Sequence, residues 1–415
     1  MTEEDNDRPL GVVPDDAPSS AAPPPAAGAD YWPVSPLDAA PGSLPGAPSS
    51  PGAPSSPVAT RNRRWWPWAI FIVVVAAIAI ASRWNLNYYA VTPGTAQSVQ
   101  QFITVPTDKA HPVTHPVLLT DVEIGRVTAL DYLFYKLQSN VTLEQVDSVT
   151  GGTAPSQLTA QGNLEMSQAE VDAKVSALRR LGYKVTATPS GAVIAGTYPG
   201  TPAYPVLNVG DVVSAVDGTP TLTADALIST LRQYHAGQTI VLTVRKGGTA
   251  PPAPESITLK NTTINIGESK PVTLDLGIEV EDQVDYGFPF PVHINVTNIG
   301  GPSAGLAMTL GVIDALTSGS LTGGHTVAAT GTMDSQGNVG PIGGVPQKTI
   351  AVENAGASIF LVPLQQYQGA MSKDRPGLKI YPVTTLNQAL ADLAAHGGVV
   401  PPAHVTSGRS PTSSG

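Results

Sequence analysis

The chain of 415 residues contains no cysteine, and this absence removes several kinds of chemistry. Without cysteine there can be no disulfide framework, no thiolate nucleophile and no cysteine-bound metal. Charged residues make up only 13% of the chain, and the net charge of −10 lacks the basic excess that is typical of nucleic-acid binding. The zinc-binding motif His-Glu-x-x-His is also missing. We therefore expect no metal, no cofactor and no nucleic-acid partner.

Glycine and proline, by contrast, are abundant, and many of them lie at the two ends of the chain. Residues 1–60 are rich in Pro, Ala, Ser and Gly, and the hexapeptide that begins at Pro45 repeats at once from Pro51. Such a composition cannot bury enough apolar surface to offset chain entropy, so a disordered tail is predicted. A proline-motif docking site is the alternative. Residues 398–415 return to a similar composition and predict a second disordered tail.

An apolar run follows the first tail. From Trp65 to Ser82 it would form a helix of about 27 Å, close to the thickness of the hydrocarbon core of a membrane. Tryptophans at its start and arginines before it predict a single transmembrane helix with a cytoplasmic N-terminus. Everything after Arg83 would then be extracytoplasmic, anchored to the cell membrane. A cleaved signal peptide is the alternative, since residues 79–81 resemble a cleavage site, but signal peptides begin near residue 1.

Residues 85–182 show less pattern, and their fold stays unassigned. One helix is predicted near their end, because Ser167 and Glu170 form a capping box, apolar residues follow at helical spacing, and Gly182 suits a helix stop. The rest of this region is free to complete the sheet of the module that follows.

Residues 185–260 predict a small β-rich module. The stretch from Gly210 to Gly218 indicates a turn, a strand and a turn, Thr223 suits a helix cap, and Ile240–Val244 is a β-branched strand. Its Gly-Asp-Val-Val start resembles the signature of bacterial protease-associated PDZ domains, which bind extended peptides by adding a strand to a sheet edge. A β-rich spacer without a peptide groove is the alternative.

Residues 263–397 predict a denser domain of mixed strands and helices, with Ser303 as a candidate nucleophile. Pro302 suits the first position of a helix, and apolar residues then continue at helical spacing to Leu316. Ser303 falls in the first turn, where unpaired N–H groups and the positive end of the helix dipole can stabilise a tetrahedral oxyanion. The alternative is that Ser303 only caps the helix.

Lys348 is the candidate general base. A helix is predicted from Val345 to Asn354. Lys348 lies on its apolar side with Val345, Val352 and Ala355, away from Gln347, Glu353 and Asn354. Burial and a nearby helix N-terminus both lower the pKa of a lysine, and a neutral amine can take a proton from a serine hydroxyl. The alternative is a surface lysine whose stem lies along apolar residues.

Two blocks of this domain resemble the Lon proteases. The first is Gly301-Pro302-Ser303-Ala304-Gly305, which is similar to their nucleophile motif. The second comprises Thr330-Gly331, Gly337-Asn338-Val339 and the segment from Pro341 to Lys348, in the same order as in that family. The resemblance implies that Ser303 is the nucleophile, that Lys348 is the general base and that Thr330 orients the lysine. Pro302 and Ala304 would support the oxyanion site, and a homo-hexameric ring is implied as well.

The chain departs from the Lon pattern in two ways. Gly300 occupies a place where many Lon proteases carry an acidic residue. The chain also lacks the Gly-x4-Gly-Lys-Ser/Thr loop of an ATPase module. The order of anchor, PDZ-like module and Lon-type domain resembles the Lon-like PDZ proteases of bacterial cell surfaces. An ATP-independent enzyme that cuts unfolded or tethered extracytoplasmic proteins is thus implied.

The resulting hypothesis is an α+β multidomain, membrane-anchored serine endopeptidase with a Ser303–Lys348 dyad. A non-catalytic PDZ-containing envelope adaptor and a protein that cuts only its own linker are the alternatives. A triad built on His293 or His325, which flank the serine in sequence, is less favoured.

Overall fold

The computed structural model describes residues 65–151, 153–260, 262–264, 272–274, 276–297, 299–373 and 376–402. The predicted disordered tail at residues 1–60 lies outside this part of the chain, as do residues 403–415 of the predicted C-terminal tail.

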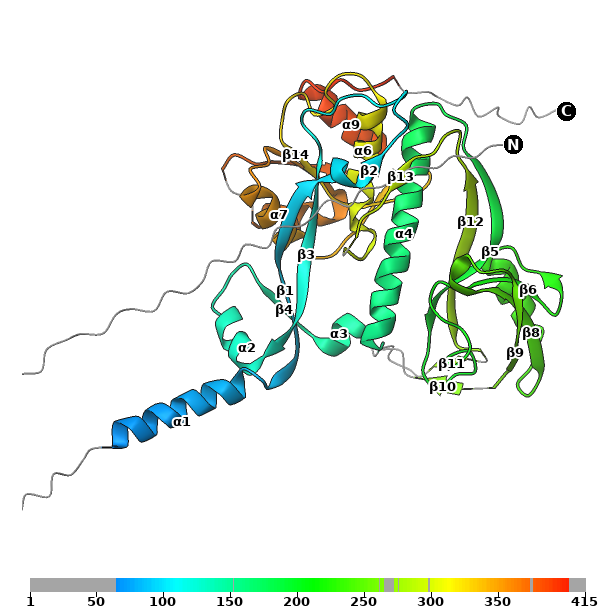
Figure 1. The fold of residues 1–415 in the computed structure, drawn as a ribbon, viewed down its shortest axis with the longest axis horizontal. Coiled ribbons are helices and arrows are strands. Elements are labelled where there is room, and N and C mark those ends of the chain that lie inside the picture. Colours follow the sequence, from blue (N-terminus) through cyan, green and yellow to red (C-terminus); the bar gives the residue numbers. More distant parts are fainter. Residues whose placement is uncertain are drawn as a thin grey trace, which may run out of the picture. The chain divides into compact units, whose positions relative to one another are not determined.

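The larger of the two main folding bodies is built on a mixed sheet, drawn in Figure 1. Its strand order is β18 (Lys379–Val383), β17 (Ile359–Pro363), β14 (Val327–Ala329), β3 (Leu118–Thr128), β1 (Asn85–Ser98) and β4 (Thr142–Gln145). The first four of these strands run parallel to one another, whereas β1 is antiparallel to both β3 and β4. Strand β17 is buried throughout, which matches its unbroken apolar sequence Ile-Phe-Leu-Val.

Helices cover this sheet and complete its core. They are α2 (Ala129–Tyr135), α3 (Val146–Thr150), α4 (Pro155–Arg180), α6 (Gly305–Leu316), α7 (Val345–Asn354), α8 (Tyr367–Met371) and α9 (Leu386–Ala395). All residues of α6 are buried, and its apolar side chains share one core cluster with those of α4 and α9. Short pieces join them: β2 (Ile103–Thr104), β13 (His293–Ile294), β15 (Thr332–Met333), β16 (Val339–Gly340), and the 3-10 turns η1 (Val99–Phe102), η3 (Pro302–Ala304) and η4 (Leu364–Gln366).

The second body, formed between α4 and β13 in the chain, has its own six-stranded sheet and its own core. Its strand order is β12 (Ile278–Gly287), β5 (Thr186–Thr197), β6 (Val212–Val216), β8 (Thr239–Arg245) and β9 (Ala253–Thr258), with β7 (Thr219–Pro220) paired to β6. Helix α5 (Ala224–Leu231) packs on it, capped by Thr223 as expected. The turn η2 (Lys246–Gly248) follows β8, and β10 (Thr262–Ile264) pairs with β11 (Val272–Leu274).

Strand pairing assigns the region that the sequence left open. Strands β1 and β3 lie in the same sheet as β14 and β17, so residues 85–128 do not complete the sheet of the second body. Conversely, β12 pairs with β5 over ten residues of β12, although it belongs to the range 263–397 that was predicted for the proteolytic domain. The larger body is therefore assembled from two separate stretches of the chain, and the domain limits at 260 and 263 stay predictions.

The predicted helix start at Ser167 is wrong. Helix α4 begins at Pro155, twelve residues earlier, with proline at its first position and no side-chain cap at Ala154. The carboxylate of Glu170 accepts a hydrogen bond from Val296 N (2.8 Å) instead of closing a capping box.

The fold-class prediction is wrong in its transmembrane helix, and the single-pass location in the cell membrane is wrong with it. Helix α1 runs from Trp66 to Ala81, 16 residues, and a turn then leads directly into β1. This length corresponds to about 24 Å, against about 30 Å of hydrocarbon. Among the described residues, no helix is both long enough and apolar enough to span a bilayer. With parallel and antiparallel strands in one sheet and helices between them, the fold is mixed α/β.

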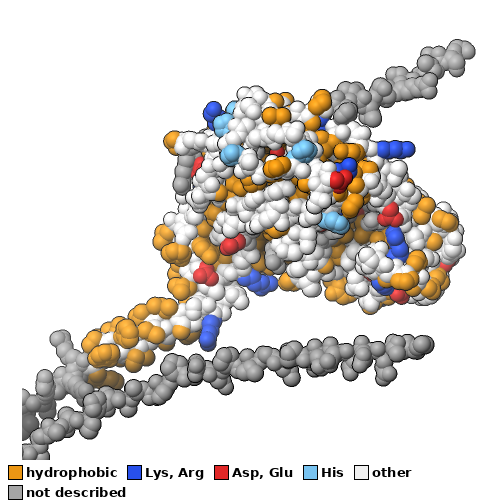
Figure 2. Space-filling model, turned by 45° about the horizontal axis from the view of Figure 1, so that its top comes forward, with side chains coloured by type: hydrophobic (Ala, Val, Ile, Leu, Met, Phe, Trp, Pro, Cys, Tyr) orange, Lys and Arg blue, Asp and Glu red, His pale blue; other side chains and the backbone are white. Residues whose placement is uncertain are grey.

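Charged side chains are sparse on the face of the protein shown in Figure 2, where they lie scattered among apolar and uncharged polar surface. This sparseness agrees with the low charged fraction of the chain, 13%.

Candidate active site

Ser303 lies in a tight turn at the head of a buried helix. The turn η3 (Pro302–Ala304) follows Gly301, whose φ of 86° is easy only for glycine, and leads into α6. The helix predicted from Pro302 to Leu316 is thus divided into one 3-10 turn and α6. Because the first N–H groups of a helical turn have no partner within the turn, those of Ser303 and Ala304 lie where an anion can be held.

The loop after β14 is hydrogen-bonded to this turn. The carbonyl oxygen of Ser303 accepts hydrogen bonds from Gly331 N (2.9 Å) and from the Thr330 hydroxyl (3.1 Å). Leu306 N returns a bond to Gly331 O at 3.0 Å. Strand β14 lies between β17 and β3, so its buried pairing sets the position of Thr330 and, through it, of the serine.

Lys348 reaches the serine from α7, which has the predicted bounds Val345–Asn354. The lysine is 2% exposed, and its Nζ lies 2.7 Å from Ser303 Oγ and 3.3 Å from Thr330 Oγ1. The predicted apolar side of α7 is correct for Val345 and Val352, which are buried beside the lysine, and wrong for Ala355, which is exposed. Gln347 is also buried, and it donates a hydrogen bond to Thr142 of β4 at 2.7 Å.

Burial makes the Lys348 amine a usable base. Loss of solvent around the ammonium lowers the pKa of Lys348 to about 8, while the negative charge of Asp121 on β3 works in the opposite direction. Asp121 Oδ1 also accepts a hydrogen bond from Thr95 N at 2.5 Å, which fixes its carboxylate. With a pKa near 8, about a tenth of the molecules carry a neutral amine at pH 7.

Helix α4 supports the turn Pro302–Ala304, which carries the candidate nucleophile Ser303 and is called the nucleophile turn below. The sequence did not reveal this role of α4. Gly301 N donates to the carbonyl oxygen of Gly162 at 2.8 Å. A Cβ added at Gly162 would lie 3.6 Å from Gly301 N, so the two backbones are in van der Waals contact. Gly300, the place of an acidic residue in many Lon proteases, has no side chain. An acidic group comes from α4 instead, because Glu165 Oε2 lies 3.9 Å from the position that a Cβ on Gly301 would take.

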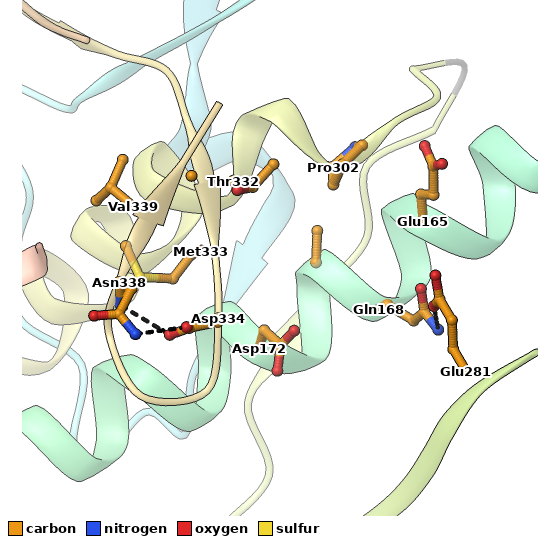
Figure 3. Close-up of a pocket in the computed structure, with 12 residues that line it drawn as sticks. Glu165, Gln168, Asp172, Glu281, Pro302, Thr332, Met333, Asp334, Asn338 and Val339 are labelled. Carbon is orange, nitrogen blue, oxygen red and sulfur yellow. Dashed lines mark hydrogen bonds between the residues drawn. The ribbon is translucent and has the colours of Figure 1, made fainter. Parts of the chain in front are cut away.

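Two cavities lie on either side of this support. One, of about 1000 Å³, is bounded by Val122, Met166 and Gly300–Gly301 and has walls of mixed polar and apolar character. The other, of about 350 Å³, is shown in Figure 3 and lies between α4, Pro302 and the β15–β16 hairpin. Pro302, which precedes Ser303, lines the smaller cavity, and Gly300 and Gly301 line the larger one, while Ser303 itself lines neither.

The histidines do not share in this arrangement. His293 is on β13, paired with Thr104. The His325 ring contacts the ring of His396. Asp314 is buried within α6 and accepts a hydrogen bond from Leu321 N (3.2 Å), a local contact, and burial raises its pKa to about 6. Among the described residues, no group of three His, Cys, Asp or Glu side chains is placed to hold a metal ion.

Comparison with known proteins supports a serine peptidase. Residues 280–395 match the Lon protease (S16) C-terminal proteolytic domain. Lon protease 2 of Bacillus subtilis is 36% identical over 107 residues, which are 25% of this chain and 19% of that protein. Lon protease of Rickettsia bellii is 32% identical over 121 residues, 28% of this chain and 15% of that protein. Over residues 280–395 the chain is therefore similar to the proteolytic domain of Lon proteases, and the match spans less than a fifth of either relative.

Among solved structures, similarity is found to PDZ domains. The PDZ domain of an SdrC-like protein from Listeria monocytogenes aligns with 22% of this chain and 90% of its own length, at 20% identity and a TM-score of 0.19. The second domain of a related Listeria protein aligns with 23% of this chain and 88% of its own length, at 23% identity and a TM-score of 0.18.

Proposed function

We propose that this protein is a serine endopeptidase in which Ser303 and Lys348 form the catalytic dyad. The observation that carries the proposal is the 2.7 Å approach of Lys348 Nζ to Ser303 Oγ in a site from which the amine is almost wholly shielded from water. Such a distance is within hydrogen-bond reach for a nucleophile and its base.

The dyad accounts for both halves of peptide hydrolysis. Neutral Lys348 takes the proton from Ser303 Oγ as the oxygen attacks the scissile carbonyl carbon, and the carbonyl oxygen becomes an oxyanion. The resulting ammonium gives its proton to the departing amine nitrogen, which leaves an ester on Ser303. The amine then takes a proton from a water molecule that attacks the ester, and returns it to Ser303 Oγ as the acid product leaves.

Thr330 orients the base in this proposal. Its hydroxyl hydrogen points to Ser303 O, so its oxygen can only accept from Lys348 Nζ. A neutral amine that donates one hydrogen to Thr330 presents its lone pair to Ser303 Oγ. The backbone N–H groups of Ser303 and Ala304 stabilise the oxyanion, and Pro302 fixes the turn that aims them.

Substrates of the proposed enzyme are polypeptides in extended or unfolded form, and their cleavage needs no ATP. The PDZ-like module at residues 185–260 would recruit them by strand addition, and six subunits would form a ring, as the Lon resemblance implies. Sedimentation of the purified chain tests the ring directly.

A labelling experiment tests the dyad. A fluorophosphonate serine probe and an unfolded protein substrate are each given to the wild type, Ser303→Ala and Lys348→Met, without nucleotide. We expect labelling and cleavage by the wild type only. A wild type that ignores both reagents would instead be the non-catalytic adaptor. Mass spectra in which only the chain's own linker is cut, and only with Ser303 present, would identify a self-processing protein.

A further inference from the structure

The smaller cavity beside the nucleophile turn is lined by acidic side chains from three separate elements. Glu165 and Asp172 project from the same side of α4, seven residues apart, Glu281 comes from β12, and Asp334 from the β15–β16 hairpin. Figure 3 shows Asp172 beside Asp334 of the hairpin and Gln168 beside Glu281, with Pro302 also lining the cavity. No Lys, Arg or His lines this cavity.

The negative charge of this acidic cleft (Glu165, Asp172, Glu281 and Asp334) is not neutralised within the described residues. The salt bridges among the described residues pair Lys109 with Asp108, and Lys246 with Asp211 and Glu255. None of them involves a carboxylate of the cleft. Glu281 accepts a hydrogen bond from the Gln168 amide at 3.1 Å. Asp334 accepts hydrogen bonds within its hairpin from Gln336 N, Asn338 N and the Asn338 amide, so the donors to both carboxylates are neutral. Arg179 lies close enough to favour the charged form of Asp172, but it donates to Ser335 O (2.9 Å) and covers the ring of Tyr286.

Crowding of these carboxylates has an electrostatic cost in the absence of a cation. Burial and the charge of Asp334 raise the pKa of Asp172 to about 6, and partial burial together with Glu281 and Glu279 raises the pKa of Glu165. A positive group that enters the cleft would relieve this repulsion and be held by it.

The larger cavity provides a contrast within the same molecule. Its one carboxylate, Glu170, already has partners, because it accepts a hydrogen bond from Val296 N and lies near the ammonium of Lys174. The smaller cavity is thus lined by four carboxylates, whereas the larger one is lined by a single carboxylate.

A metal ion is the less favoured occupant of the acidic cleft. Binding of a divalent cation needs several carboxylate oxygens around one point, and no three acidic or histidine side chains in the described part of the chain are so placed. The long, flexible side chains of lysine and arginine can instead meet carboxylates that are spread along a groove.

A third cavity adjoins the acidic cleft and extends it away from Pro302. It measures about 380 Å³ and shares Gln168, Asp172 and Glu281 with the smaller cavity. This cavity lies along β12, which is an edge strand of the sheet that also contains β5 and β6. An extended peptide could therefore lie between α4 and β12 and continue past Asp172 to the nucleophile turn.

We infer that the acidic cleft is a substrate subsite for lysine or arginine, so that the enzyme prefers extended polypeptide segments with a basic residue close to the scissile bond. The inference rests on the proposed endopeptidase function and adds its substrate class. Asp172 and Glu281 are the specificity-determining residues, since both border the two cavities.

Internally quenched peptides test this inference. In a set of otherwise identical peptides, one position at a time on either side of the cleaved bond carries Lys, Gln or Glu. We expect one or two positions at which Lys raises kcat/KM about three- to tenfold over Gln, and at which Glu lowers it. In Asp172→Asn with Glu281→Gln the Lys-to-Gln ratio should fall to near one. The exposed Asp225→Asn, on α5, removes the same type of charge elsewhere and should keep the ratio.

Binding to Ser303→Ala separates this inference from the proposed function. By fluorescence anisotropy, the labelled Lys peptide should bind this variant more tightly than the Gln peptide, and the two cleft substitutions should remove the difference. If the wild type cleaves Lys, Gln and Glu peptides equally at every position, the subsite inference is overturned while the endopeptidase stands. Selective binding of the Lys peptide without any cleavage would keep the subsite and reject the proposed chemistry. Melting temperatures check folding, and the amide variants should be no less stable because they relieve repulsion.

Discussion

The carbonyl oxygen of Gly162 accepts a hydrogen bond from Gly301 N, so the middle of α4 is joined directly to the turn that carries Ser303. These residues are far apart in the chain, and the approach of the two backbones leaves room at position 162 for no side chain larger than a methyl group. Helix α4 also supplies two carboxylates of the acidic cleft. One helix therefore connects the position of the nucleophile with the proposed choice of substrate.

The size limit at Gly162 can be tested with two substitutions. Gly162→Ala should be tolerated, because its Cβ meets the neighbouring backbone at ordinary contact distances of 3.6 Å and more. Alanine in place of glycine inside a helix should raise the free energy of unfolding by about 0.5–1 kcal/mol. Gly162→Leu should displace the turn and lower kcat at least about tenfold. Thermal unfolding and peptide cleavage measure both effects, and full activity in the leucine variant would show that the contact does not matter.

The pH dependence of cleavage should follow the Lys348 amine. Its pKa of about 8 means that the neutral, proton-accepting form grows as pH rises through that value. We expect kcat/KM for an uncharged peptide to increase by close to tenfold per pH unit below pH 7, and to level off above pH 9. An uncharged peptide is chosen because Asp172 titrates near pH 6. A flat profile between pH 6 and 9 would contradict the assignment of Lys348 as the base.

Stability should respond to the same group with a definite sign. Because the folded-state pKa of Lys348 is below its unfolded value, the unfolded chain binds more protons between about pH 8 and 10.5, and stability from this residue rises with pH across that window. Lys348→Met keeps the volume and removes the buried charge. At pH 7 it should raise the free energy of unfolding by about 1–3 kcal/mol and abolish cleavage. Urea unfolding at pH 7 and at pH 10.5 should show a gain that shrinks at the higher pH. An equally large gain at both would place its origin elsewhere.

Thr330 is expected to act as a positioning residue. Thr330→Val removes the hydroxyl that joins Lys348 Nζ to Ser303 O, while Gly331 N still holds that carbonyl. We expect a fall in kcat of about ten- to a hundredfold with little change in KM. The midpoint of the pH profile should also move to lower pH, because the ammonium loses an acceptor. Thr330→Ser retains the hydroxyl and should restore most of the rate. If valine and serine behave alike, the hydroxyl has no such role.

Local sequence was sufficient for α7 and insufficient for α4. The glycine pair before Val345, the proline in the first turn and the spacing of Val345 and Val352 predicted the bounds of α7 and the burial of Lys348, because capping and amphipathic periodicity act over a few residues. The capping box at Ser167 failed because a helix end depends on whether preceding residues also gain from packing. Gly162 does so against the turn that carries Ser303, and Gln157 and Gln161 donate hydrogen bonds to carbonyl oxygens of β5.

The membrane prediction failed on length. Composition and flanking tryptophans suit a spanning helix, but α1 extends over 16 residues before Ser82 and Arg83 turn into β1. Hydropathy describes how apolar a segment is, whereas the strand that follows decides where the helix stops.

The order of residues along the chain determined which groups could react: a serine after Gly-Pro at the start of a turn, a lysine on the apolar side of a helix, and a threonine between them. Side-chain chemistry and short-range periodicity are local properties, so the sequence contains them directly. Only the tertiary structure decided that β1, β3 and α4 belong to this site, that Asp121 opposes the lowering of the lysine pKa, and that carboxylates from α4, β12 and a hairpin share one cleft. Contacts between distant segments depend on how whole sheets and helices pack, and no local pattern records which partner each surface will meet.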